Sequence, residues 1–180
     1  MGYTTSFEGQ FLLDRRLTEA HSAYLQQFGG TRRMKRDVAK LAAVPDPVRE
    51  AVGLPLGPEG AYFVGGEGFM GQDDHPSILE HSEPPEGQPG LWCHWIPDDR
   101  GTHIVYSGDE KFYNYIDWLE YLITHFLAPW GYFLNGEVTW EGEEEEDEGL
   151  IRVQDNQVEA FMLESEEDPA LEVIQGEMDD

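Results

Sequence analysis

The stretch from Glu110 to Trp140 constrains the fold most, because it contains the longest helical period in the chain. Its first part carries apolar residues at every third or fourth position, a pattern that predicts a helix lying on a core. These residues are Phe112, Tyr115, Ile116, Leu119, Leu122, Ile123, Phe126 and Leu127. A second stripe beside them consists of Asn114, Trp118, Tyr121 and His125. The helix must therefore be covered on two sides, or be covered on one side and bind a ligand or partner with the other.

The segments around this helix predict an α+β fold. Pro129 ends the helix, and the aromatic and β-branched residues that follow it predict a strand. Alternating residues predict further strands, and Thr18 is expected to cap a shorter helix that ends before Gly29. The expected strands are 2–13, 91–96, 102–106, 132–140, 150–153 and 158–163. We therefore expect an antiparallel sheet of about five to six strands, packed by one long and one shorter helix.

The composition divides the chain into a folded part and a tail. Residues 1–163 are expected to form a single domain, in which the proline- and glycine-rich residues 44–90 make a long loop-rich connection. Residues 164–180 are acidic and are expected to form a flexible tail. The chain has no apolar run of 18 or more residues and no charged-then-apolar leader. We therefore expect no membrane span, no signal peptide and a cytoplasmic location.

The net charge of −26 is unevenly distributed along the chain. Residues 1–50 contain eight Lys and Arg against six Asp and Glu, whereas residues 51–180 contain three against 31. Such a field repels nucleic acids and anionic membranes, and it attracts basic protein surfaces. The charge therefore predicts a basic protein partner and argues against direct binding of nucleic acid or a membrane.

Five of the eleven basic residues lie in one segment, 31–40, with the sequence TRRMKRDVAK. The favoured interpretation is a solvated helical turn whose cations neutralise the acidic remainder of the chain. The alternative is a segment that contacts an anion. One short cluster in so acidic a chain is a poor footprint for nucleic acid.

An acidic run lies between two predicted strands and is expected to protrude as a loop. The carboxylates expected to contact a partner are Glu143, Glu144, Glu145, Glu146, Asp147 and Glu148. The leading hypothesis is a non-enzymatic interaction module that docks on a basic, nucleic-acid-binding protein, with carboxylates placed where phosphates would lie. A purely solubilising surface needs the same charge and remains the alternative.

A second hypothesis is a pocket with aromatic walls and a few polar groups, as small-ligand sites have. Its expected residues are Trp92, His94, Trp118, Tyr121, His125, Asn135 and Glu137. This pocket would bind a small ligand or a nucleotide derivative, and its histidine and glutamate could serve as acid and base. The competing interpretation is an ordinary core in which the tryptophan and tyrosine side chains satisfy their polar groups internally.

No catalytic signature stands out in the sequence, so a role without catalysis is favoured and neither a metal nor another cofactor is expected. A zinc site would need Cys93, His94 and His103 with an acidic residue or histidine from 73–75. Their spacing does not match that of structural zinc sites, and neighbours on a strand point to opposite faces. Cys93 is expected to be a buried, inert thiol.

Four segments resemble a family of uncharacterised phage and bacterial proteins. They read GYTTSFEGQF at the start of the chain, then GLWCHWIP, EKFYNYIDWLEYLI and GYFLNGEVTW. The resemblance covers the first predicted strand and most of residues 90–160. It implies no activity, cofactor or catalytic residue. A phage origin is what it implies, and with it a small acidic inhibitor of a host machine.

Overall fold

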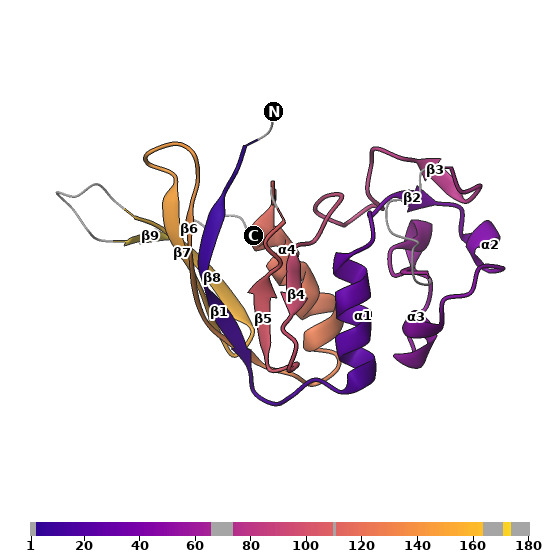
Figure 1. Cartoon of the computed structure of the whole chain (residues 1–180), viewed down its shortest axis with the longest axis horizontal. Coiled ribbons are helices and arrows are strands. Elements are labelled where there is room, and N and C mark those ends of the chain that lie inside the picture. Colours follow the sequence, from indigo (N-terminus) through magenta and orange to yellow (C-terminus); the bar gives the residue numbers. More distant parts are fainter. Residues whose placement is uncertain (1–2, 66–73, 110, 164–170, 174–180) are drawn as a thin grey trace.

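The computed structural model describes residues 3–65, 74–109, 111–163 and 171–173. Seven strands in this part of the chain form one antiparallel sheet in the order β4-β5-β1-β6-β7-β8-β9 (Figure 1). They are β1 (Ser6–Leu13), β4 (Trp95–Pro97), β5 (His103–Tyr106), β6 (Leu134–Glu141), β7 (Glu148–Gln154), β8 (Gln157–Leu163) and β9 (Leu171–Val173). The predicted α+β fold is confirmed. The short strand β9 extends the sheet from within the expected tail, by pairing with β8.

Two helices cover one face of this sheet, as Figure 1 shows. The shorter one, α1 (Glu19–Gly29), begins at the predicted cap, where the Thr18 side chain accepts a hydrogen bond from the backbone N–H of His21. The longer one consists of α4 (Tyr115–Leu122) together with the π-helical turn η2 (Ile123–Leu127) that continues it. No helix among the described residues is both long and apolar enough to cross a membrane.

The alternation of β6 decides which of its residues reach the core. Leu134, Val138 and Trp140 are buried against the helices, whereas Glu137 and Thr139 are exposed on the opposite face. The same alternation holds in β7, where Ile151 and Val153 are buried. Both apolar stripes of the long helix contribute to this core. Their buried members are Phe112, Ile116, Trp118, Leu119, Tyr121, Leu122, Ile123, Phe126 and Leu127.

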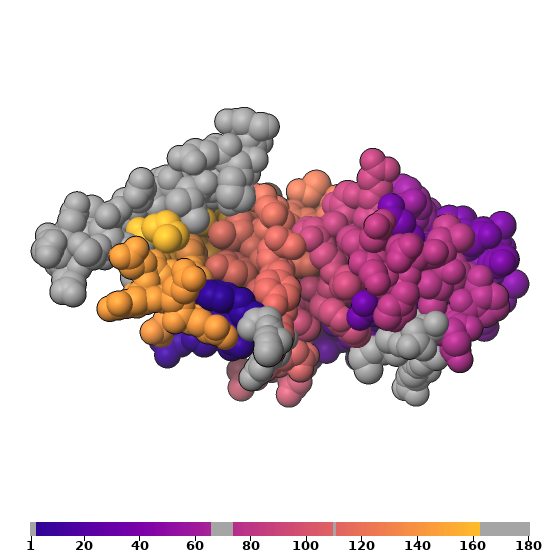
Figure 2. Space-filling view, turned by 90° about the horizontal axis from the view of Figure 1, so that it is seen from above, coloured from indigo at the N-terminus to yellow at the C-terminus, as the bar shows by residue number. Residues whose placement is uncertain are grey.

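The segment between α1 and β4 forms an irregular lobe beside α1, at the end of the molecule opposite β7 and β8 (Figures 1 and 2). Its short elements are β2 (Lys35–Arg36), α2 (Val38–Leu41), α3 (Pro47–Ala51), the 3₁₀ turn η1 (Pro58–Gly60) and β3 (Ile78–Glu80). The prediction of a solvated helical turn at 31–40 holds for its last residues, which form the exposed part of α2. It is wrong for the first part, which is not helical and contains two arginines that are each 2% exposed, Arg33 and Arg36. Arg33 donates to the carbonyl of Ala61 and lies over the ring of Phe28, so it supports the lobe from inside.

Candidate functional site

A cavity of about 700 Å³ opens where the lobe, the approach to β4 and the approach to α4 meet. One lining residue, Arg32, comes from the basic segment after α1. The others come from two short stretches: Gly90, Leu91, Trp92 and His94 before β4, and Asp109, Lys111, Tyr113 and Asn114 before α4. These three parts of the sequence meet because the sheet places β4 beside α1 and α4.

Aromatic rings form part of the cavity lining. Trp92 and His94 are two residues apart on an extended segment, and their ring planes are 7° from parallel with centroids 6.5 Å apart. Phe112 supports His94 from the core with an edge-to-face contact at 5.0 Å. Tyr113 follows Phe112 and is 51% exposed. Flat, partly solvated rings of this kind can contact an aromatic ligand with little reorganisation.

His94 lines this cavity and has one buried polar atom without a described partner. The residue is 7% exposed, and its Nδ1 has no hydrogen-bond partner in the described part of the chain. The nearest acidic group, Asp109 Oδ2, lies 4.0 Å from Nδ1, which is too long for a hydrogen bond. Burial lowers the pKa of His94 in spite of Asp109, so the ring is neutral at pH 7. An unpaired buried polar group costs about 1–3 kcal/mol, but this atom is closed to solvent, so a ligand could reach it only after a side chain moved.

Trp118 places a second unsatisfied group beside the cavity. The residue is 0% exposed, and its indole Nε1 has no hydrogen-bond partner among the described residues. A Cβ atom added to Gly90 would lie 3.5 Å from this Nε1, so the indole edge lies next to a cavity residue. Trp118 is therefore core by burial, while its polar edge is directed to the margin of the cavity.

The two cations of the cavity are held in different ways. Arg32 donates from Nε to the carbonyl of His81 at 3.2 Å, and its terminal nitrogens donate to no described residue. Lys111 has a left-handed backbone with φ of 68°, and Asn114 repeats this conformation with φ of 59°. Non-glycine residues adopt it at a cost that the surrounding structure must outweigh, and such positions gather at functional sites.

Trp92 and His94 line this cavity, but three other residues of the predicted pocket do not: Tyr121, His125 and Glu137. Tyr121 accepts a hydrogen bond from the Gln88 side chain at 2.9 Å. His125 stacks on Tyr121 at 4.0 Å and hydrogen-bonds the Tyr62 hydroxyl through Nδ1 at 2.9 Å. Glu137 is paired with Arg152 at 2.9 Å on the outer face of the sheet. Tyr121 and His125 thus have internal partners, as the competing interpretation of an ordinary core expects, whereas Glu137 lies outside the core.

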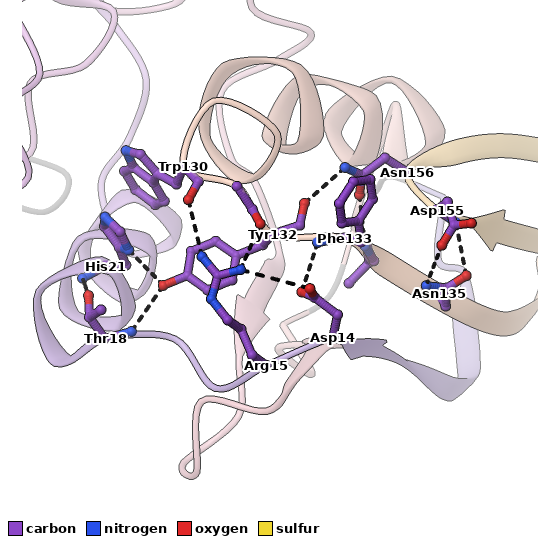
Figure 3. Close-up of polar contacts among 12 residues, drawn as sticks. Asp14, Arg15, Thr18, His21, Trp130, Tyr132, Phe133, Asn135, Asp155 and Asn156 are labelled. Carbon is purple, nitrogen blue, oxygen red and sulfur yellow. Dashed lines mark hydrogen bonds and ion pairs between the residues drawn. The ribbon is translucent and has the colours of Figure 1, made fainter.

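Asn135, the last residue of the predicted pocket, belongs to a polar network at the end of β6 (Figure 3). Its side chain accepts from the backbone N–H of Asp155, and the neighbouring Asn156 bonds the backbone of Leu134 and Tyr132. The Tyr132 hydroxyl in turn meets His21 Nδ1 at 2.8 Å. This network ties the β7–β8 turn to the start of α1. Its hydrogen bonds are made within the protein, which indicates a structural role.

The acidic loop lies between β6 and β7, as the sequence predicts, and part of it is fastened to the N-terminal segment. The carboxylate of Asp147 accepts from the Tyr3 hydroxyl at 2.7 Å and from the Trp140 indole at 2.9 Å. A carboxylate oxygen of Glu143 accepts from the backbone N–H of Thr4 at 2.8 Å. The other expected contact residues divide between solvent and sheet: Glu144, Glu145 and Glu146 are exposed, and Glu148 begins β7. Asp147 is thus a structural carboxylate, and the exposed charge is concentrated in 144–146.

Cys93 is fully buried, and burial raises the pKa of its thiol to about 12. A protonated, enclosed thiol is a poor nucleophile and a poor metal ligand. Among the described residues, no three His, Cys, Asp or Glu side chains are grouped so that they could hold a metal ion. Asp73, one possible ligand of the zinc alternative, lies outside the described residues.

No protein-family model matches this chain, and comparisons with curated proteins and with solved structures found no match. The cavity must therefore be interpreted from its own chemistry. Sequence reasoning identified Trp92 and His94 but missed Arg32, Lys111 and Tyr113. The available signals were the alternative anion-binding interpretation of the basic segment and the polar residues just before the long helix.

Proposed function

We propose that this chain is a binding protein whose ligand is a small organic molecule held against Trp92 and His94. The observation that carries the proposal is that the rings of Trp92, His94 and Tyr113 line one cavity. The cavity volume, about 700 Å³, lies inside the range of about 300–1,000 Å³ that is usual for such sites. Its lining combines flat rings with polar and charged side chains, which can orient a ligand: Arg32, His94, Asp109, Lys111 and Asn114.

A screen of aromatic fragments by ligand-detected NMR tests this proposal. Fragments that bind the parent protein should lose at least about tenfold in affinity in Trp92→Ala, because the side chain supplies a large flat contact. His94→Gln should weaken those fragments that hydrogen-bond Nδ1. Phe133→Ala is the matched control, since Phe133 is 48% exposed and is not part of the cavity lining. Fragment binding that is absent, or equal in Trp92→Ala and the parent, would overturn the proposal.

The second candidate is the acidic interaction module, and one observation favours it. Tyr3, Thr4 and Trp140 hold the loop by hydrogen bonds to Asp147 and Glu143, so the intervening carboxylates are presented from fixed ends. Single exposed ion pairs are worth only about 0–1 kcal/mol, but a row of charges can steer association with a basic surface. The resemblance to phage proteins makes an inhibitor of a nucleic-acid-binding host protein a reasonable form of this module.

The loop hypothesis is tested with a partner captured from lysate at low and high salt. Replacing Glu144, Glu145 and Glu146 by Gln should slow association and flatten its salt dependence, because these side chains are exposed and are not needed to hold the loop. The control variant neutralises three exposed carboxylates elsewhere, Glu83, Glu86 and Asp99. An equal effect of both variants would show that net charge acts, and not this loop.

A further inference from the structure

We infer that the ligand of the cavity is a planar aromatic anion of the nucleoside monophosphate class. This inference rests on the proposed function, since it names the chemistry that the same cavity would bind. The aromatic ring would lie against Trp92 and Tyr113, and the single anionic group would meet Arg32 and Lys111. Among the lining residues that the structure describes, Trp92 and Tyr113 offer the flat contact, and Arg32 and Lys111 are the cations.

The charge of the cavity is the first step. The chain holds 11 Lys and Arg against 37 Asp and Glu, so its cations have many possible internal partners. Several are paired in this way: Lys35 with Glu59, Arg49 with Asp46 and Arg152 with Glu137. Arg32 and Lys111 make no ion pair with any residue that the structure describes. Arg16, Lys40 and Arg100 also lack an ion pair among the described residues, so what distinguishes Arg32 and Lys111 is that both line one cavity. Two cations at one cavity of a strongly acidic protein favour an external anion.

The positioning of these cations is the second step. The bond from Arg32 Nε to the His81 carbonyl fixes the base of the guanidinium and leaves its terminal nitrogens for a ligand. A planar guanidinium can bind two oxygens of a phosphate at once. Two residues that follow Lys111 are fixed in place. Phe112 is 2% exposed, and the Asn114 side chain donates to the Pro89 carbonyl at 2.7 Å. The left-handed backbone of Lys111 is therefore held from its C-terminal side.

The aromatic part of the ligand follows from the remaining lining. Nucleobases stack readily on tryptophan and tyrosine, because every base has a flat π-face. The ring of His94 also lines the cavity and lies nearly parallel to that of Trp92, so it adds a further flat contact.

The remaining charge argues for one anionic group in place of several. Asp109 also lines the cavity, so its cations exceed its carboxylates by one. The chain as a whole carries a net charge of −26, which repels further negative charge. A triphosphate would gain little from Arg32 and Lys111 beyond the first phosphate, and it would place additional charge in a repulsive field. The site should therefore prefer a monophosphate to a triphosphate.

Isothermal titration calorimetry with four probes tests the inference: adenosine 5′-monophosphate, adenosine 5′-triphosphate, adenosine and inorganic phosphate. The monophosphate should bind most tightly. Arg32→Gln and Lys111→Gln should each weaken it about tenfold or more, as expected for a charge-assisted hydrogen bond, and leave adenosine unchanged. Arg100→Gln and Lys40→Gln are the matched controls, since both side chains are exposed and neither lines the cavity.

The outcomes separate this inference from the proposed function. If adenosine binds as tightly as its monophosphate and the two charge variants change nothing, the inference is overturned while the aromatic site stands. The same holds if neutral fragments bind at Trp92 and none of the four probes does. If neither the probes nor the fragments bind in a manner that depends on Trp92, both proposals fall.

Discussion

The cavity and the acidic loop differ in whether their polar groups have hydrogen-bond partners within the described part of the protein. In the loop, Asp147 receives hydrogen bonds from Tyr3 and Trp140. At the cavity, the corresponding ring nitrogens of His94 and Trp118 find no partner among the described residues. The indoles of Trp118 and Trp140 thus form a matched pair, both almost fully buried, of which only one has its N–H satisfied.

The comparison distinguishes the amount of charge in a region from the presence of polar groups that lack a partner. The loop is the most charged stretch of the chain, yet its anchoring carboxylates are already used to fix the fold. The cavity is far less charged, but groups that are costly to leave unpaired lie there. A high density of charge and buried groups without a described partner therefore mark different parts of the molecule.

The largest expected effect comes from Trp118→Ala, which tests whether this residue is core or cavity wall. Because the side chain is 0% exposed, its removal should cost about 3–5 kcal/mol of unfolding free energy, measured by chemical denaturation. An unchanged denaturation midpoint together with weakened fragment binding would make Trp118 a wall of the cavity and not part of the core.

A smaller effect is expected from the paired changes Trp118→Phe and Trp140→Phe. Both remove an indole N–H and some volume, but only the second breaks a hydrogen bond, the one to Asp147 at 2.9 Å. Trp140→Phe should therefore cost about 1 kcal/mol more than Trp118→Phe in the same denaturation experiment. Equal losses would mean that the two indoles are equally satisfied, and the contrast between cavity and loop would disappear.

The prediction expected to have the smallest effect concerns pH. Burial is the main cause that lowers the pKa of His21, His94 and His125, so the unfolded chain binds more protons than the folded chain just below the ordinary histidine value of about 6.5. Stability should be full above that pH and should fall as the pH drops toward the folded-state values. Thermal melting in a pH series checks this, and His94→Gln should melt with a shallower dependence. A slope equal to that of the parent would show that His94 is not held neutral.

The fold was largely predictable because its signals are local. The spacing of Leu119, Ile123 and Phe126 indicates a buried helix face, and the cap at Thr18 indicates where α1 begins. The hairpin of β4 and β5 follows from two short apolar runs around a polar turn. Each of these depends on residues a few positions apart, where period and turn chemistry are reliable guides.

The cavity was only partly predictable because its residues meet through tertiary contacts. Trp92 and His94 share one side of an extended segment, and their aromatic character made them candidates. Glu137 is a different case, because the alternation of Leu134 and Val138 already places it on the opposite face of β6 from the core. Arg32 could not be assigned to the cavity from the sequence, since that requires knowing that the start of the lobe lies beside the approach to β4.

The position of β1 in the sheet has a consequence for how the protein is made. This strand is synthesised first, yet it lies in the interior of the sheet between β5 and β6, which follow much later in the chain. On a ribosome, one of its edges stays without its native partner until β5 has been translated, and the other until β6 has followed the long helix. Folding must then close large loops, which slows it toward the millisecond-to-second range of proteins rich in long-range contacts. The nascent chain would therefore depend on timing or on a chaperone to keep β1 from pairing with another molecule.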